Sequence, residues 1–135
     1  MPDREQAIKT FKSMAETHVK SMQEAFGATL CYDEGSIFLL DDLIARKGVT
    51  PDDDNFQVII LTAGSYLGET LLRVLGGRWE YDDELEWVVE IEGERISPFT
   101  MIIRQFTQTN APHITDWYKE FKEKLGKGGE RDTDQ

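Results

Sequence analysis

At Gly76-Gly77 the spacing of the apolar residues changes from that of a helix to that of a strand. Before the pair, apolar side chains recur at helical steps over residues 53–75. After it they alternate with polar ones in "RWEYDDELEWVVEIEGERI". Glycine readily adopts the backbone conformations that end a helix and turn the chain. The sequence therefore predicts a long helix that leads directly into a small sheet.

The segment after the glycine pair predicts three strands joined by tight turns. The strands are expected at residues 78–81, 85–92 and 95–96, with turns at 82–84 and 93–94. Consecutive strands joined by turns this short pair antiparallel, as a meander. One further short strand is expected earlier in the chain, at residues 29–32.

Amphipathic segments on both sides of the sheet segment predict helices. Asp3 and Gln6 can form a capping box before the first helix, and Gly27 can supply the left-handed residue that ends it. Ser97-Pro98 has the order of a helix start. The helices are expected at residues 3–26, from 33 or 36 to 46, at 53–75, from 98, and at 114–125. We expect an α+β fold in which about five helices pack on a small antiparallel sheet in two layers. Residues 1–125 would form one domain, and the glycine-rich residues 126–135 a disordered tail.

The chain carries a net charge of −11, from 26 acidic and 15 basic residues among 135. This charge repels the phosphates of nucleic acid, so we expect no nucleic-acid partner and consider a basic protein instead. Plain solubility is the alternative explanation of the charge. No uninterrupted apolar run approaches the roughly 20 residues of a membrane span, so no membrane association is expected.

The cysteine, histidine and acidic residues show no catalytic or metal-binding pattern. Cys31 is the only cysteine, which excludes an internal disulfide and favours a reducing cytoplasm; we expect it to be an inert core thiol. The N-terminus lacks the apolar core of a signal peptide, which also favours the cytoplasm. His18 and His113 complete no triad or zinc motif, and "DDDN" and "YDDELE" lack calcium-loop spacing. We therefore expect no cofactor and no metal.

The stretch "TAGSYLGETLLRVLGGRWEY" contains two glycines four residues apart inside a predicted helix. Glycine costs about 1 kcal/mol of helix propensity relative to alanine, so close approach of a neighbouring element is the expected compensation. Phosphate-binding glycine loops lie between a strand and a helix, which does not fit this placement. The residues expected to be structural are Gly64, Gly68, Gly76, Gly77 and Pro98.

Glu69 is the open functional question of the same stretch. It precedes Arg73 by four residues, the favourable order for an exposed helical salt bridge. If Glu69 is instead buried beside Tyr66 and Trp79, it can act as a base or as a hydrogen-bonding hub. These four residues form the first candidate binding site.

The predicted strand at residues 85–92 forms a second candidate binding site, through Glu86, Glu90 and Glu92. Alternation places these carboxylates on one face and the apolar Trp87 and Val89 on the other. A carboxylate face can bind a basic partner, or it can prevent the sheet from pairing edge to edge with another sheet.

The pattern G-x-Y-L-G-E, then G-G-x-W, then I-x-P-F resembles that of a group of small uncharacterised bacterial domains. It spans about residues 29–121. Its marked positions would be Tyr66, Gly68, Glu69, Gly77, Trp79 and Pro98. The resemblance implies no activity, and it does not distinguish a binding site from residues that determine the fold.

Two classes of function remain. The first is a non-catalytic protein-interaction module, of the immunity or adaptor type, whose acidic face binds a basic partner. The second is a small-molecule-binding or enzymatic domain with a pocket around Tyr66, Glu69 and Trp79. Homo-oligomerisation through an apolar patch is compatible with either class.

Overall fold

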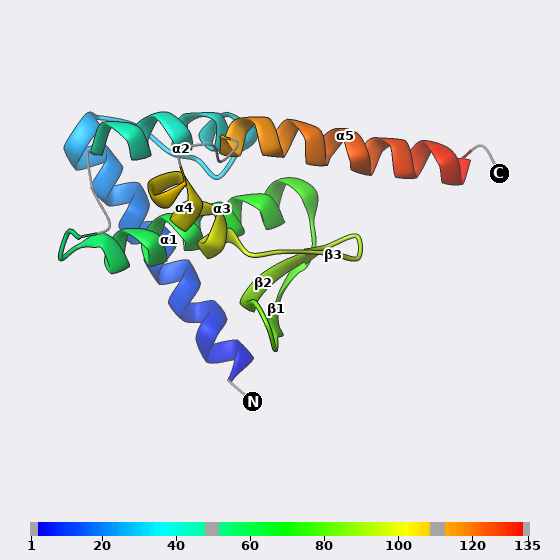
Figure 1. Ribbon diagram of the computed structural model, residues 1–135, viewed down its shortest axis with the longest axis horizontal. Helices are drawn as coiled ribbons and strands as arrows, with labels where there is room; N and C mark the ends of the chain where they lie inside the picture. Colours follow the sequence, from blue (N-terminus) through cyan, green and yellow to red (C-terminus); the bar gives the residue numbers. More distant parts are fainter. Residues whose placement is uncertain (1–2, 48–51, 109–112, 134–135) are drawn as a thin grey trace.

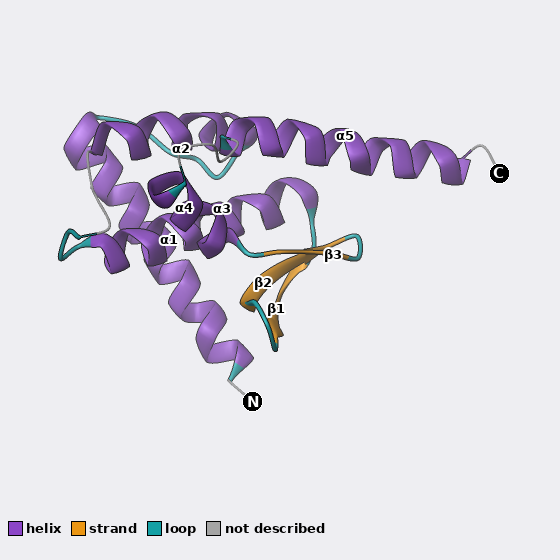
Figure 2. Cartoon of the chain, in the orientation of Figure 1, coloured by secondary structure: helices purple, strands orange, loops and turns teal. Residues whose placement is uncertain are grey.

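The computed structural model describes residues 3–47, 52–108 and 113–133, with side chains up to residue 42 in the first range and 126 in the last. Within these residues, five helices accompany a three-stranded antiparallel sheet of order β1-β2-β3 (Figures 1 and 2). The predicted α+β fold and the meander are confirmed. The elements are α1 (Arg4–Phe26), α2 (Glu34–Lys47), α3 (Phe56–Leu75), β1 (Arg78–Asp82), β2 (Glu86–Ile91), β3 (Glu94–Ile96), α4 (Pro98–Thr107) and α5 (Ile114–Thr133).

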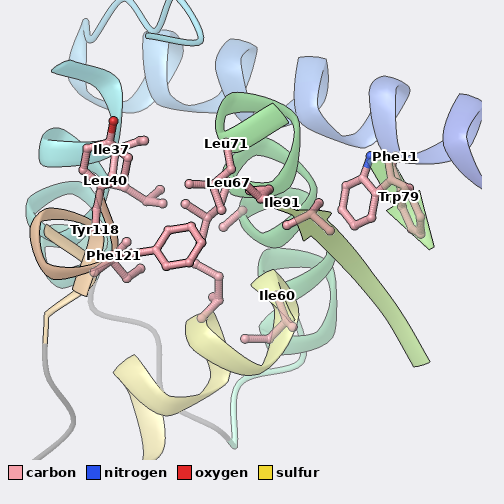
Figure 3. Close-up of a cluster of buried hydrophobic side chains, with 14 residues drawn as sticks. Phe11, Ile37, Leu40, Ile60, Leu67, Leu71, Trp79, Ile91, Tyr118 and Phe121 are labelled. Carbon is pink, nitrogen blue, oxygen red and sulfur yellow. The ribbon is translucent and has the colours of Figure 1, made fainter. Parts of the chain in front are cut away.

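Helix α3 is the centre of the core. It packs against α1, α4, α2 and β2, and its residues from Ala63 to Leu71 are buried. In Figure 3, Phe11 of α1 lies against Trp79 of β1 at one end of the core, and Tyr118 and Phe121 of α5 meet α2 at the other. Among the described helices, α3 alone has the length and mean hydropathy, 1.4, of a membrane span, but 61% of that window is buried inside the fold.

Predicted capping signals form as hydrogen bonds at four helix ends. The Asp3 side chain accepts from the backbone N–H of Gln6, and Gly27 ends α1 in the left-handed conformation with φ 67°. Asp33 accepts from the backbone N–H of Ser36 and starts α2. Ser97 accepts from the backbone N–H of Thr100 at the start of α4, as the Ser-Pro order predicts. Local signals thus define these ends.

Helix α2 provides the hydrogen bonds at the start of α5. The two carboxylate oxygens of Asp41 accept from the backbone N–H groups of Ile114 and Thr115, at 2.9 and 2.7 Å. At the other end of the contact, Glu34 accepts from the hydroxyl of Tyr118 at 2.6 Å. A carboxylate at a helix N-terminus is favoured by the helix dipole. The two helices are therefore joined by polar contacts as well as by apolar ones.

The predicted strand at residues 29–32 is wrong, because this segment is an extended loop. Its backbone donors bond to side chains instead of a neighbouring strand: Cys31 N donates to the hydroxyl of Ser36, and Tyr32 N to the hydroxyl of Tyr66. Tyr32 also has a φ of 58°, which no regular strand contains. Cys31 is exposed, so the prediction of a buried core thiol is wrong as well.

Two helices have bounds that differ from the prediction. Helix α3 begins at Phe56 instead of Asp53, because Asp53 forms a turn in which its carbonyl accepts from the N–H of Phe56. Helix α5 continues past Gly126 to Thr133, where the sequence predicts a disordered tail. The apolar spacing of α2 also predicts that Leu43 and Ile44 face inward, but both lie outside the described side chains.

Candidate functional site

Glu69 is a buried carboxylate at the junction of α3 and β1. Its side chain is 5% exposed, and its Oε2 accepts a 2.9 Å hydrogen bond from the indole Nε1 of Trp79. Trp79 is buried as well. A hydrogen bond to an ionised group is stronger than a neutral one, particularly in a packed interior. The hydrogen bond of Glu69 thus connects the first strand to α3.

The two glycines inside α3 make room for this junction. A Cβ at Gly68 would overlap the ring of Trp79 and approach Pro98 at 3.2 Å. A Cβ at Gly64 would overlap the ring of Phe99, at the start of α4. Neither ring can reach α3 past a side chain at these positions, so both glycines serve the packing of β1 and α4 on the central helix.

The glycine pair after α3 has two separate roles. Gly76, with φ 82°, ends the helix, and its N–H donates to the carbonyl of Leu72. Gly77 has a φ of 111°, and a Cβ there would overlap the carbonyl oxygen of Glu90 on β2. The first glycine turns the chain, and the second lets β1 start beside β2.

Tyr66 has different contacts from those of Glu69 and Trp79. Its hydroxyl accepts a 3.0 Å hydrogen bond from the backbone N–H of Tyr32, and the two rings lie 4.8 Å apart. The ring of His18, which is buried on α1, lies 5.2 Å from Tyr66. The structure therefore does not bring Tyr66 into one pocket with the other candidate residues.

Arg73 lies between these two groups. Its guanidinium carbon lies 3.7 Å from the ring centroid of Tyr32, and its Nη2 lies 3.9 Å from Oε1 of Glu69. The Tyr32 hydroxyl donates to Glu16 at 2.7 Å. Burial and this hydrogen bond to a carboxylate raise the pKa of Tyr32, which stays neutral at physiological pH. Arg73 thus stacks on a neutral phenol while its side chain stays 51% exposed.

A concavity of about 280 Å³ lies beside Glu69, between α1, α3 and β1. Glu69, Arg73 and Trp79 line it, and Tyr66 does not. From α1 it receives Arg4 and Lys12, eight residues apart on one helix face. The candidate pocket near Glu69 therefore exists, but α1 contributes residues that the sequence did not single out.

The second candidate site does not form a continuous carboxylate face. In the strand register, Glu90 lies opposite Arg78 on one side and Arg95 on the other, and it forms ion pairs with both, at 3.5 and 3.3 Å. Glu86 is the first residue of β2 and Glu92 follows its last residue, with φ values of 68° and 49°. Of the three, only Glu90 lies inside the strand, and its charge is balanced there.

Asp82 organises the turn of the β1–β2 hairpin. Its Oδ1 accepts from the backbone N–H groups of Glu84 and Leu85, at 2.8 and 3.0 Å, and its Oδ2 accepts from Arg95 at 2.8 Å. The backbone donor of Leu85, together with Arg95, lowers the pKa of Asp82 to about 2. This carboxylate is therefore ionised and structurally engaged.

The three other carboxylates of this turn are exposed to solvent. Asp83, Glu84 and Glu86 surround Leu85, an apolar side chain that is 45% exposed. Within the described part of the chain, none of these three carboxylates forms an ion pair. The hairpin tip, which we define as residues 83–86, thus combines an exposed leucine with negative charge that no cation among the described residues balances.

A second concavity, of about 260 Å³, borders the hairpin tip. It lies among β3, α4 and α5, and Leu85 lines one edge. Ile96, Met101 and Trp117 contribute apolar surface, and Arg104 lies on α4. The sequence did not indicate this concavity, because its residues come from three separate elements.

The described residues include no group of three or more His, Cys, Asp or Glu side chains that could hold a metal ion. His18 is buried on α1, whereas His113 is exposed before α5, so the two do not meet. No protein-family model, curated protein or solved structure matches the chain.

Proposed function

We propose that this chain is a non-catalytic protein-interaction module that binds a basic protein through the hairpin tip. The observation that carries the proposal is Leu85, 45% exposed among three carboxylates that no described cation balances. The partner would provide lysine or arginine side chains to Asp83, Glu84 and Glu86. It would also provide an apolar side chain to Leu85 and the adjacent concavity.

The charge of the whole chain supports this assignment. A net charge of −11 attracts a basic partner from a distance, and exposed carboxylates raise the rate of encounter. Asp82 and Glu90 are already paired with arginines, so the contact charges are Asp83, Glu84 and Glu86 instead of the strand face. Glu92 lies at the opposite end of β2 and would contribute only to the long-range field.

The proposal extends to compartment and family. An exposed free thiol at Cys31 suits a reducing cytoplasm, where we place the module. The G-x-Y-L-G-E and G-G-x-W pattern would mark a group of small bacterial domains that share the junction of Gly68, Glu69 and Trp79. In such a group the pattern determines the fold, and the hairpin tip would vary with the partner.

The experiment starts with a photo-crosslinking amino acid in place of Leu85, introduced in the cells from which the chain comes. The cross-linked partner is identified by mass spectrometry, purified, and titrated with the unmodified protein. We expect a basic protein, because the hairpin tip offers uncompensated carboxylates. The double variant Asp83→Lys/Glu84→Lys should bind it about tenfold more weakly, and added salt should weaken the wild-type complex.

The matched control is Glu24→Lys/Glu120→Lys, which adds the same charge at exposed positions of α1 and α5. It should change the affinity much less than the hairpin variant does. If the two variants lost affinity equally, the interaction would depend on the net charge of the chain and not on the hairpin tip. An acidic partner, or a cross-link to a second copy of the chain, would contradict the proposal; the second result would support homo-oligomerisation.

A further inference from the structure

We propose that the concavity between α1, α3 and β1 binds a small organic anion, a carboxylate or a phosphate monoester, between Lys12 and Arg73. This site is separate from the hairpin tip and goes beyond the proposed interaction function. It also gives the pocket beside Glu69 a ligand class. The inference rests on the charge, the free donors and the apolar surface of this one region.

The charged residues that line the concavity are mostly cationic, whereas those of the whole chain are mostly acidic. Four cationic side chains line the concavity, from Arg4, Lys12, Arg73 and Arg78, together with one carboxylate, Glu69. In the whole chain, acidic residues outnumber basic ones by 26 to 15. A local cluster of positive charge in a strongly acidic protein concentrates anions at that point.

Two of these cations have donors available for a ligand. Lys12 is exposed and makes no ion pair within the described part of the chain. The guanidinium carbon of Arg73 lies over the Tyr32 ring, 3.7 Å from its centroid, and the contact of Arg73 with Glu69, at 3.9 Å, is longer than a hydrogen bond. The N–H groups at the edge of its guanidinium can therefore bind an oxyanion in bidentate fashion.

The two other cations are held by the protein and mainly contribute their field. Arg4 donates from Nε to the carbonyl of Trp79 at 2.9 Å and lies 3.9 Å from Glu80. Arg78 pairs with Glu80 at 2.6 Å and with Glu90 at 3.5 Å. These pairings fix both guanidinium groups beside β1, so the anion position is assigned to Lys12 and Arg73.

Glu69 is the one carboxylate among the lining residues, and its Oε2 accepts from Trp79. The four lining cations outnumber it, so the lining as a whole attracts an anion. Ile8 and Leu72 add apolar surface to the same concavity. Its volume of about 280 Å³ lies just below the roughly 300 Å³ at which typical ligand sites start. The ligand is therefore small, with one oxyanion and a short apolar part.

The indole N–H of Trp79 provides a direct reporter, because it bonds to Glu69 at the wall of the site. Its NMR signal is followed while inorganic phosphate or butyrate is added at constant ionic strength. We expect a shift that saturates with at least one of the two probes. Butyrate has a short apolar chain, so it tests the contribution of the apolar surface. Tighter binding of phosphate would identify a phosphate monoester as the ligand class.

The variant Lys12→Gln should lower the affinity at least fivefold for the probe whose shift saturates. It removes the one lining cation that has no partner among the described residues. Lys12 is exposed, so this variant keeps the fold and its unfolding temperature. The matched control Lys9→Gln removes an exposed charge from the same helix but outside the lining, and should leave the affinity unchanged. Shifts that never saturate, or equal effects of the two variants, would overturn the proposal.

Discussion

In the α3–β1 junction the carboxylate of Glu69 is enclosed and bonded to Trp79, whereas at the hairpin tip Asp83, Glu84 and Glu86 face solvent with no described cation. The two regions are joined by a single strand, β1. At the junction, removal of the acidic side chain leaves a buried N–H without an acceptor. At the hairpin tip, the acidic side chains form no ion pair with the described residues. A carboxylate that the fold does not need is free for a partner.

The outer face of the sheet lies between these extremes. Glu90 and Asp82 are both partly accessible, yet arginines on neighbouring strands balance them. Arg95 connects the two, because it reaches from β3 to Glu90 on β2 and to Asp82 on β1. Glu90 and Asp82 count toward the net charge of −11, but a partner would find their charges already balanced by arginines. The position of each carboxylate decides its role.

The largest effect is expected for Gly68→Ala at the junction. A Cβ there overlaps the buried Trp79 ring, and overpacking costs up to about 3 kcal/mol. Alanine returns up to about 1 kcal/mol of helix propensity. The free energy of unfolding, measured in denaturant, should thus fall by about 2 kcal/mol.

Gly35→Ala is the matched control for this substitution. Gly35 also lies in a helix, but a Cβ there meets only an Asp33 oxygen at 3.6 Å, an ordinary contact. Stability should stay the same or rise by up to about 1 kcal/mol. A Gly68 variant as stable as the Gly35 variant would show that Trp79 moves without cost, and the junction would lose its role as a fixed point of the fold.

The next largest effect is expected for Glu69 itself. Leucine leaves the Trp79 N–H buried without an acceptor, which costs about 1 to 3 kcal/mol, so Glu69→Leu should destabilise the protein by about 1.5 kcal/mol. Glu69→Gln keeps a carbonyl oxygen for the same N–H and should cost less. Denaturant unfolding measures both variants.

Glu84→Leu and Glu84→Gln provide the control at the hairpin tip. Both should stay within about 0.5 kcal/mol of the wild type, because this side chain is exposed and unpaired among the described residues. If Glu69→Gln destabilised the protein as much as Glu69→Leu, the carboxylate charge would matter more than the hydrogen bond. The junction would then be primarily an ion-pair site for Arg73.

Sequence patterns predicted the features of this fold that depend on local physics. The caps at Asp3 and Ser97, the left-handed Gly27, and the alternation around Trp87 each depend on residues close in the chain. The loop at residues 29–32 was missed because its backbone bonds to the side chains of Ser36 and Tyr66. Nothing in the composition of "TLCY" distinguishes such partners from a neighbouring strand.

The candidate sites were predicted less completely, for the same reason. Burial of Glu69 follows from its neighbours on β1, and the concavity beside it needs α1 to cross α3. The spacing of Arg4, Ile8 and Lys12 shows a shared helix face, but not which surface that face meets. The balance at Glu90 depends on strand register, which places Arg78 and Arg95 on either side of it.

The smallest expected effect is a difference in the pH dependence of stability between variants of two neighbouring carboxylates, Asp82 and Asp83. Because its pKa is lowered from 3.8 to about 2 in the folded protein, Asp82 stabilises the fold above pH 4, and this stabilisation is lost as the pH falls towards 2. Asp82→Asn keeps an oxygen for the N–H groups of Glu84 and Leu85 but cannot titrate. Its unfolding temperature should therefore fall less steeply than that of the wild type between pH 4 and pH 2.

Asp83→Asn removes the same charge one residue later, at a carboxylate that is exposed and unpaired within the described residues. Since Asp83 accepts no hydrogen bond and forms no ion pair among the described residues, the unfolding temperatures of this variant should run parallel to those of the wild type. Parallel curves for Asp82→Asn and the wild type would mean that Arg95 and the turn do not distinguish the two positions. Divergence at Asp82 alone would show that one turn holds a carboxylate engaged by the fold beside one left free for a partner.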